Sequence, residues 1–160
     1  MDRSKARCSA FDKAVNLLTF KSRTTQEIIK RLNEKGYSSE EIDEAVEKLS
    51  YYGYLNDQNY TISYIMDNAA KKGKKLISIE LEQKGIDKNI LDGVYSEVNI
   101  DEDVSIDNII KQRFSQADLC DDKVYRRIIN YFLRRGFTYD SVKRVIKKYK
   151  SYDEDGTFFY

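Results

Sequence analysis

A helix–glycine–helix junction occurs three times in this chain, and it constrains the fold more than any other feature. Its glycines are Gly36, Gly85 and Gly136, which are 49 and then 51 residues apart. Such regular spacing is typical of an internal repeat. Glycine adopts a positive φ cheaply and therefore suits the position just past the C-terminus of a helix. We predict that all three glycines share this conformation.

The residues around each glycine match the same junction. An apolar residue follows the glycine and faces an apolar residue one turn earlier in the helix, as this type of helix stop favours. A favoured N-cap comes next, and Ser38 with Glu41 fits a capping box. We also expect Asp57 to be the N-cap of the fourth helix. The apolar pairs are Leu32 with Tyr37, Leu81 with Ile86 and Phe132 with Phe137, and the N-caps are Ser38, Asp87 and Thr138.

Apolar residues at helical spacing predict three helices in each repeat and an all-α fold. The absence of proline agrees with short connections between helices. Each repeat is too small to bury much by itself, so neighbouring repeats must share surface. We therefore expect three tandem three-helix repeats in an elongated, curved array. The predicted parts are an N-terminal extension (1–8), the repeats (9–55, 56–100 and 101–150) and a flexible C-terminal tail (151–160).

The sequence lacks the usual chemistry of an enzyme. It has no histidine, the commonest general base and metal ligand, and no phosphate-binding glycine loop. The acid pairs Glu40-Glu41 and Asp121-Asp122 fit helix starts better than a metal site. We predict no catalytic residue, no metal and no cofactor.

Two cysteines, Cys8 and Cys120, are too few for a disulfide framework or a zinc site. No run of about 20 apolar residues predicts a transmembrane helix, and the first residues lack a secretory signal. We expect a cytoplasmic chain that does not contact membranes.

Charge is unevenly distributed around a net value of +1. Residues 123–150 hold ten Lys or Arg against one acid, whereas residues 92–122 and 34–57 carry balances of −7 and −5. The basic residues could bind a partner, or they could be the solvated faces of amphipathic helices. The first candidate set is Arg126, Arg127, Arg134, Arg135, Lys143, Arg144, Lys147 and Lys148, and the second is Lys71, Lys72, Lys74 and Lys75.

Three tyrosines, Tyr51, Tyr52 and Tyr54, precede the second repeat. They could stack on nucleic-acid bases, but we expect them to pack between repeats.

The repeated junctions, joined by GYLND, resemble the RecX family of bacterial regulators of the RecA recombinase. The matching segments are EIIKRLNEKGYSSEEIDEAVEKL, GYLNDQNY, ISIELEQKGI and YFLRRGF, in the same order as in the family and within residues 9–150. Thr61 departs from the alanine that is common in the family, and lysines replace arginines in the loop before the second junction.

The resemblance implies helix-turn-helix-like units and a monomer that binds the RecA–single-stranded DNA filament. It implies inhibition of recombinase, ATPase and co-protease activity, and so a role in DNA repair, homologous recombination and the SOS response. Two alternatives stay open. One is a DNA-binding protein, for single- or double-stranded DNA, that reads a groove through the ninth helix with Lys143, Arg144 and Lys147. The other is a protein-interaction scaffold without nucleic-acid contact.

Overall fold

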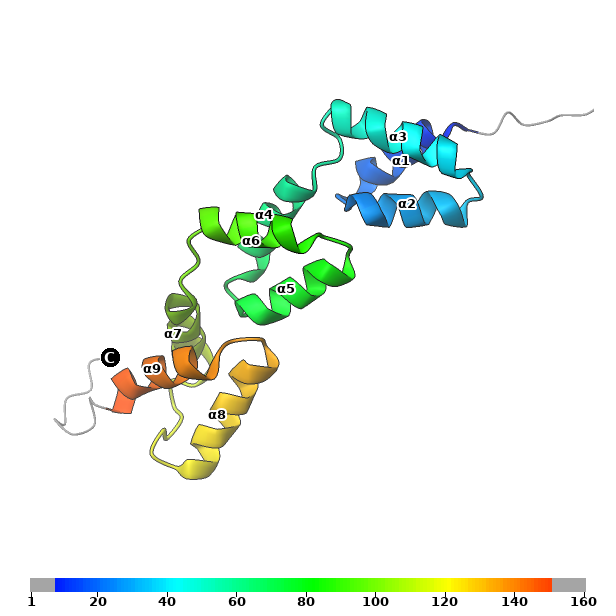
Figure 1. Ribbon diagram of the computed structural model, residues 1–160. Coiled ribbons are helices and arrows are strands. Elements are labelled where there is room, and N and C mark those ends of the chain that lie inside the picture. The colour runs from blue at the N-terminus through cyan, green and yellow to red at the C-terminus, as the bar shows by residue number, and fades with distance from the viewer. Residues whose placement is uncertain (1–7, 151–160) are drawn as a thin grey trace, which may run out of the picture. The chain divides into compact units, whose positions relative to one another are not determined.

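The computed structural model describes residues 8–150, so the predicted tail and all but Cys8 of the predicted N-terminal extension lie outside the described residues. Within this range the chain forms nine α-helices and no strand, which confirms the all-α helical-repeat prediction (Figure 1). The helices are α1 (Ala10–Phe20), α2 (Thr25–Glu34), α3 (Ser39–Tyr51), α4 (Asp57–Asn68), α5 (Lys74–Gln83), α6 (Lys88–Glu97), α7 (Glu102–Arg113), α8 (Asp122–Arg134) and α9 (Tyr139–Lys150).

The three predicted junctions are confirmed in atomic detail. Gly36, Gly85 and Gly136 have φ values of +77°, +82° and +83°. In each case the glycine N–H donates to the carbonyl three residues earlier, at 2.8, 2.9 and 3.0 Å. The next N–H donates to the carbonyl five residues earlier, at 3.3, 3.0 and 3.2 Å. This is the Schellman pattern, which satisfies the last carbonyls of a helix. Gly53, with a φ of +75°, ends α3 in the same way.

The N-caps are confirmed with one exception. Ser38 forms the expected capping box with Glu41. Asp87 and Thr138 accept from the amides of Asn89 and Ser141. The N-cap prediction for Asp57 is wrong, because Asn56 accepts from the Asn59 amide at 2.9 Å and caps α4. The Asp57 carboxylate instead accepts from the amide of Thr25 at 2.8 Å, in the first turn of α2.

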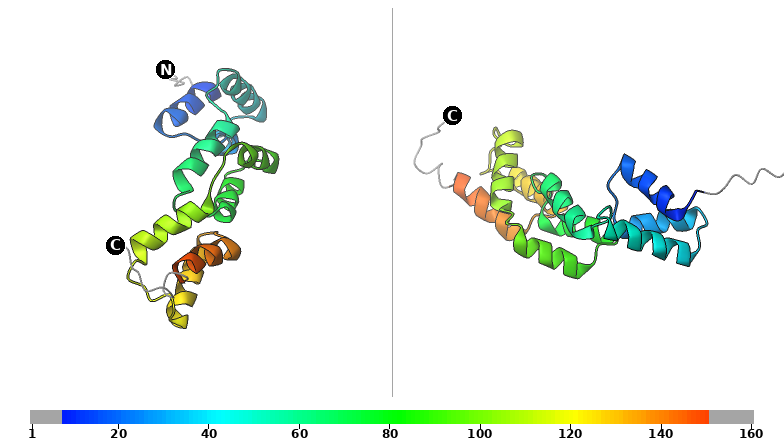
Figure 2. Two further views of the ribbon diagram at one scale, coloured as in Figure 1. Left: turned by 90° about the vertical axis from the view of Figure 1, so that its left-hand side faces the viewer. Right: turned by 90° about the horizontal axis from the view of Figure 1, so that it is seen from above.

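The chain divides into two compact units, each assembled from separate segments. One combines the described residues up to Ser63 with Leu81–Ser96, and the other combines Tyr64–Glu80 with the residues from Glu97 onward. In the first unit α1, α2 and α3 pack together around Ala14, Ile28, Leu32 and Leu49 (Figures 1 and 2). In the second, α9 packs on α7 and α8 around Ile106, Ile128, Phe132 and Ile146. The predicted boundaries at residues 55 and 100 stay predictions.

Within each unit, the start of one repeat's second helix docks on the junction of the next repeat. The hydroxyl of Thr24, the N-cap of α2, donates to the carbonyl of Lys84 at 2.6 Å. The amide of Gly73, which precedes α5, donates to the carbonyl of Arg135 at 2.8 Å. Lys84 and Arg135 are equivalent residues, because each immediately precedes a junction glycine. The same contact, a hydrogen bond to the carbonyl that precedes a junction glycine, therefore occurs in both units. Its donor is a side-chain hydroxyl in the first unit and a main-chain amide in the second.

The second and third junctions need glycine for two reasons. One is the positive φ, and the other is the close approach of another segment of the chain. A Cβ on Gly136 would lie 2.4 Å from the Leu76 amide nitrogen, and one on Gly73 would lie 2.3 Å from the Gly136 carbonyl oxygen. A Cβ on Gly85 would lie 2.4 Å from the Gln26 Cβ. Gly36, by contrast, has nothing within 4 Å of such a Cβ. The second and third junctions are thus both helix stops and docking points.

Candidate functional site

Helix α8 presents a group of four exposed cations in the second unit. Asp121 caps its start by accepting from the amides of Lys123 and Val124, at 2.6 and 3.1 Å. Ile128, Ile129 and Phe132 are buried on one side of the helix. The opposite side carries Lys123, Arg126, Arg127 and Arg134, which we call the α8 basic face; with Asn130 and Leu133 these residues line an open surface pocket.

The α8 basic face has the spacing of a single helix surface. Its residues stand at positions i, i+3, i+4 and i+11, over about 16 Å of helix. All four side chains are exposed, and none of them forms an ion pair within the described part of the chain. Lys123 was not among the predicted site residues, although its helical spacing from Arg126 and Arg127 is a signal that could have found it.

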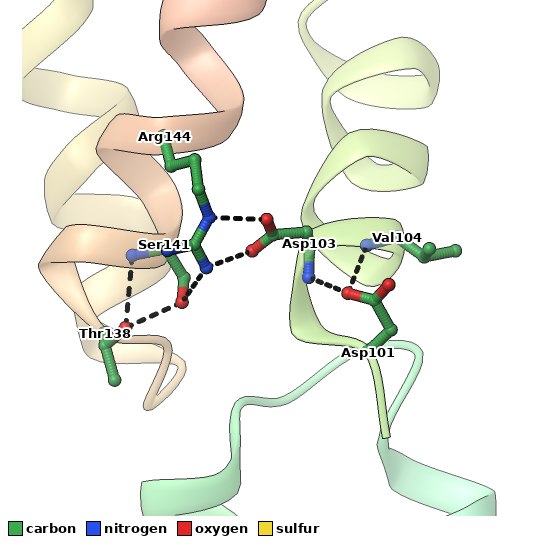
Figure 3. A network of polar contacts seen from close by, with 6 residues as sticks. All are labelled: Asp101, Asp103, Val104, Thr138, Ser141 and Arg144. Carbon is green, nitrogen blue, oxygen red and sulfur yellow. Dashed lines mark hydrogen bonds and ion pairs between the residues drawn. The ribbon is translucent and has the colours of Figure 1, made fainter. Parts of the chain in front are cut away.

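Arg144 is a predicted site residue that the structure places in an internal ion pair. Its Nε and Nη2 donate to the two carboxylate oxygens of Asp103 at 2.7 and 2.8 Å, and Nη2 also reaches the Ser141 hydroxyl at 3.2 Å (Figure 3). The hydrogen bonds from Arg144 hold the pKa of Asp103 below its ordinary value, although burial opposes this shift. The bidentate pair joins α7 to α9 and occupies the guanidinium that a partner would need.

Arg135 likewise makes its contacts within the second unit. Its guanidinium lies 4.3 Å from the ring centroid of Tyr131, a cation–π distance. Its side chain is half-buried, and its main-chain carbonyl receives the Gly73 amide. Arg135 therefore supports the junction between α8 and α9 rather than the α8 basic face.

The remaining predicted residues of α9 are exposed lysines. Lys143 lies 5.9 Å from the ring centroid of Tyr139, and Lys147 stands one turn further along the helix. Lys148 contributes to lowering the pKa of Asp103 and Asp107, so its charge acts on α7. Among the described side chains of α9, Lys143 and Lys147 are the cations most available to a partner.

The lysines of the second candidate set, within residues 71–75, lie next to the end of α8. The hydrogen bond from Gly73 to Arg135 places the turn formed by residues 71–75 next to the last turn of α8, where Arg134 lies. Lys71 and Lys75 are exposed. Lys72 instead pairs with Glu80, at 2.7 Å to both carboxylate oxygens. The structure thus joins two basic segments that lie some 60 residues apart in sequence.

Glu102 compensates for the lysines at the start of α5. A helix N-terminus disfavours cations, yet α5 begins with Lys74 and Lys75. The Glu102 carboxylate accepts from the Lys74 main-chain amide at 2.6 Å and supplies the missing negative charge. The exposed lysines can therefore remain at this helix end.

The described residues offer no group of three or more His, Cys, Asp or Glu side chains that could hold a metal ion. The carboxylate of Asp121 is engaged in capping α8. Over the same range, no helix is both long and apolar enough to cross a membrane. Cys8 and Cys120 are exposed, and neither takes part in a disulfide among the described residues.

Comparison with known proteins identifies the family. A family model described as "RecX, first three-helix domain" matches residues 10–49. A regulatory protein RecX from Finegoldia magna is 34% identical over 151 residues, which cover 88% of this chain and 71% of that protein. One from Clostridium beijerinckii is 31% identical, with 90% and 70% coverage.

The chain belongs to the RecX family.

Solved RecX structures share the helical-repeat fold. The crystal structure of RecX from Lactobacillus salivarius superposes with a TM-score of 0.72 at 26% identity, covering 87% of this chain and 93% of that one. A second RecX crystal structure, at 19% identity and a TM-score of 0.71, supports the fold alone. RecX membership and the shared name of the relatives assign this chain a regulatory role.

The exposure of the three tyrosines contradicts the prediction that they pack between repeats. The side chains of Tyr51, Tyr52 and Tyr54 are 84%, 63% and 58% exposed. The packing prediction is wrong because the Schellman turn at Gly53 buries Leu55, the next apolar residue, in their place.

Proposed function

We propose that this chain is a non-catalytic regulator that binds the RecA–single-stranded DNA filament and mainly restrains its recombinase, ATPase and co-protease activities. The observation that carries the proposal is the α8 basic face, with Lys123, Arg126, Arg127 and Arg134 exposed and without an ion pair to any residue that the structure describes. Membership of the RecX family supports the choice of partner. The chain acts as a monomer without metal or cofactor.

A filament on single-stranded DNA offers phosphates, and the α8 basic face suits them. Arginine donates two parallel hydrogen bonds to a phosphate, and its charge persists at every physiological pH. Neutralising phosphates releases condensed counterions, so binding of this kind weakens steeply as salt rises. The exposed Lys71 and Lys75, beside the end of α8, extend the same positive surface.

A helix-turn-helix protein that reads DNA through α9 is the less supported alternative. Such a mode needs side chains free to reach base edges. Arg144, the only arginine on α9, has its guanidinium on Asp103 and Ser141. Lys143 and Lys147 alone provide little base discrimination.

The test compares a charge-reversed variant with its parent. Arg126→Glu, Arg127→Glu and Arg134→Glu together should weaken binding to RecA assembled on single-stranded DNA by tenfold or more, and relieve inhibition of RecA ATPase. If each arginine neutralises one phosphate, the slope of log K against log salt should become about 2 less steep. Binding is measured at several salt concentrations, with DNA alone and RecA alone as separate arms.

A matched control reverses three exposed lysines of the first unit, Lys21, Lys30 and Lys88. This variant changes net charge equally and should bind within about twofold of the parent. Circular dichroism checks that both variants fold. A folded arginine variant that inhibits as strongly as the parent at all salt concentrations would assign the α8 basic face to solvent. Binding to DNA alone as tight as to the filament would favour the DNA-binding alternative.

A further inference from the structure

Helix α3 of the first unit ends in a cluster of exposed aromatic rings. The rings of Tyr51 and Tyr52 meet edge to face with centroids 5.3 Å apart, and Tyr54 lies 6.4 Å from Tyr52. Phe11 of α1 contacts Tyr52 at 6.4 Å and anchors the cluster to the core of the unit. These contacts pack the rings against one another and against α1. Tyrosines held in this way contribute contact area at low entropic cost, which is why they are frequent at binding surfaces.

Acidic residues occupy the same exposed face. Asp43 and Glu47 precede Tyr51 by eight and four residues, so all three lie on one side of the helix. Helix α3 carries five acids and a single lysine, Lys48, which is already paired with Glu44 at 2.6 Å. We call Asp43, Glu44, Glu47, Tyr51, Tyr52 and Tyr54 the acidic–aromatic face.

The charge of this face decides between two kinds of partner. Exposed tyrosines alone would suit stacking on nucleic-acid bases. Phosphates, however, would be repelled by the carboxylates one and two turns away from Tyr51. A guanidinium or ammonium group would be attracted by both the tyrosines and the acids of this face. Tyrosine rings bind cations through their faces, and carboxylates bind them through charge.

We propose that the acidic–aromatic face docks a cationic protein surface, with arginine side chains placed over the tyrosines and paired with Glu47 and Asp43. The α8 basic face takes phosphates under the proposed function, so the chain has two recognition surfaces of opposite chemistry, one on each unit. The second surface does not depend on the first.

The experiment maps probe binding by amide NMR on the whole chain. The probes are a capped decapeptide of alternating arginine and serine, the same peptide with lysine, the same peptide with glutamate, and a twenty-residue oligo-dT. The arginine peptide should give saturable shifts at residues 47–55 and bind at least threefold tighter than the lysine peptide. The glutamate peptide and oligo-dT should leave these signals unchanged.

Variants distinguish the contribution of the tyrosines to peptide binding from the contribution of negative charge. Tyr51→Ser with Tyr54→Ser should weaken the arginine peptide at least fivefold, whereas Phe20→Ser should not, because Phe20 is an equally exposed ring (88%) outside the face. The proposal is overturned if oligo-dT shifts residues 47–55, if the arginine peptide gives no saturable shifts there, or if the tyrosine variant binds it like the parent. Loss of oligo-dT or filament binding at α8 would instead count against the proposed function alone.

Discussion

The amide of Gly73 donates a hydrogen bond to the carbonyl oxygen of Arg135 at 2.8 Å, across 62 positions of sequence. The bond satisfies a carbonyl at the end of α8 that has no acceptor role inside its own helix. It also fixes the turn of residues 71–75 against the junction at Gly136. One backbone contact therefore joins two repeats and brings two basic segments together.

Substitution of the glycines at this contact should be costly. Gly136→Ala adds a Cβ that would lie 2.4 Å from Leu76, at a residue whose φ is already +83°. We expect a loss of about 2 kcal/mol or more, from overpacking and backbone strain together. Gly36→Ala meets open space and should cost only the strain, about 1 kcal/mol. Chemical denaturation of each variant measures the difference.

Gly93 provides the opposite control. It lies inside α6, lacks a positive φ and has nothing within 4 Å of an added Cβ. Gly93→Ala should therefore stabilise the chain by about 1 kcal/mol through helix propensity. Equal effects of alanine at positions 36 and 136 would show that the close approach to Leu76 does not matter.

The Glu27–Lys84 pair predicts a pH-dependent contribution to stability in the first unit. Burial alone would raise the pKa of Glu27, but hydrogen bonds from Lys84 and the Thr24 amide outweigh it and hold that pKa below its ordinary value. A carboxyl with a lowered folded-state pKa stabilises the fold above its unfolded-state pKa, and the gain disappears as pH falls through the folded-state value. Glu27→Gln should cost about 1 kcal/mol at pH 7 and almost nothing near pH 2.

Thermal melts of parent and variant at both pH values test this prediction. Glu82→Gln is the control, because Glu82 is an exposed glutamate of α5. It should leave the melting temperature unchanged at each pH. A Glu27→Gln variant whose deficit is the same at pH 7 and pH 2 would mean that the ionised carboxylate is not what stabilises this contact.

Local sequence signals predicted the junctions well, because they depend on residues within one turn of each other. Gly36, Ser38 and Glu41 contain everything that a Schellman stop and a capping box require. The misassigned N-cap shows the limit of this approach. Asn56 and Asp57 are both good N-caps, and only the distant Thr25 amide decides that Asp57 serves another helix.

The candidate site was predictable in composition but not in geometry. The basic character of α8 and α9 is visible in sequence, whereas the pairing of Arg144 with Asp103, 41 residues away, leaves no periodic signal. The same holds for Lys72 with Glu80, which pair across the turn before α5. The stacking of Arg135 on Tyr131 is different, because these residues are four positions apart and so lie at helical spacing. Long-range pairing decides which cations remain available, and helical periodicity carries no information about it.

Arginines in the two environments should behave differently when neutralised. Arg144→Gln removes the bidentate contact with Asp103 and should lower the melting temperature while leaving filament binding within about twofold. Arg126→Gln removes an exposed charge and should weaken filament binding about fivefold, with little change in stability. Paired melting and binding measurements on both variants are decisive. The reverse pattern would exclude the division between structural and partner-facing arginines.

The purified chain should hydrolyse no ATP. It contains no histidine and no phosphate-binding glycine loop that could hold the nucleotide. Phosphate release is measured with and without magnesium, in the absence of RecA. Hydrolysis that follows the chain through repeated purification would contradict the proposal of a non-catalytic regulator, and a magnesium-dependent rise in melting temperature would contradict the absence of a metal site.

The recurring contact between repeats bears on how such a chain can lengthen or shorten over evolutionary time. The donors, Thr24 and Gly73, stand just before the second helix of a repeat. The acceptors, Lys84 and Arg135, stand just after the second helix of the following repeat. The middle repeat carries both halves, a donor at Gly73 and an acceptor at Lys84. A tandem duplication of that segment would therefore create a copy already equipped to join its neighbours, without a new interface having to arise by point mutation.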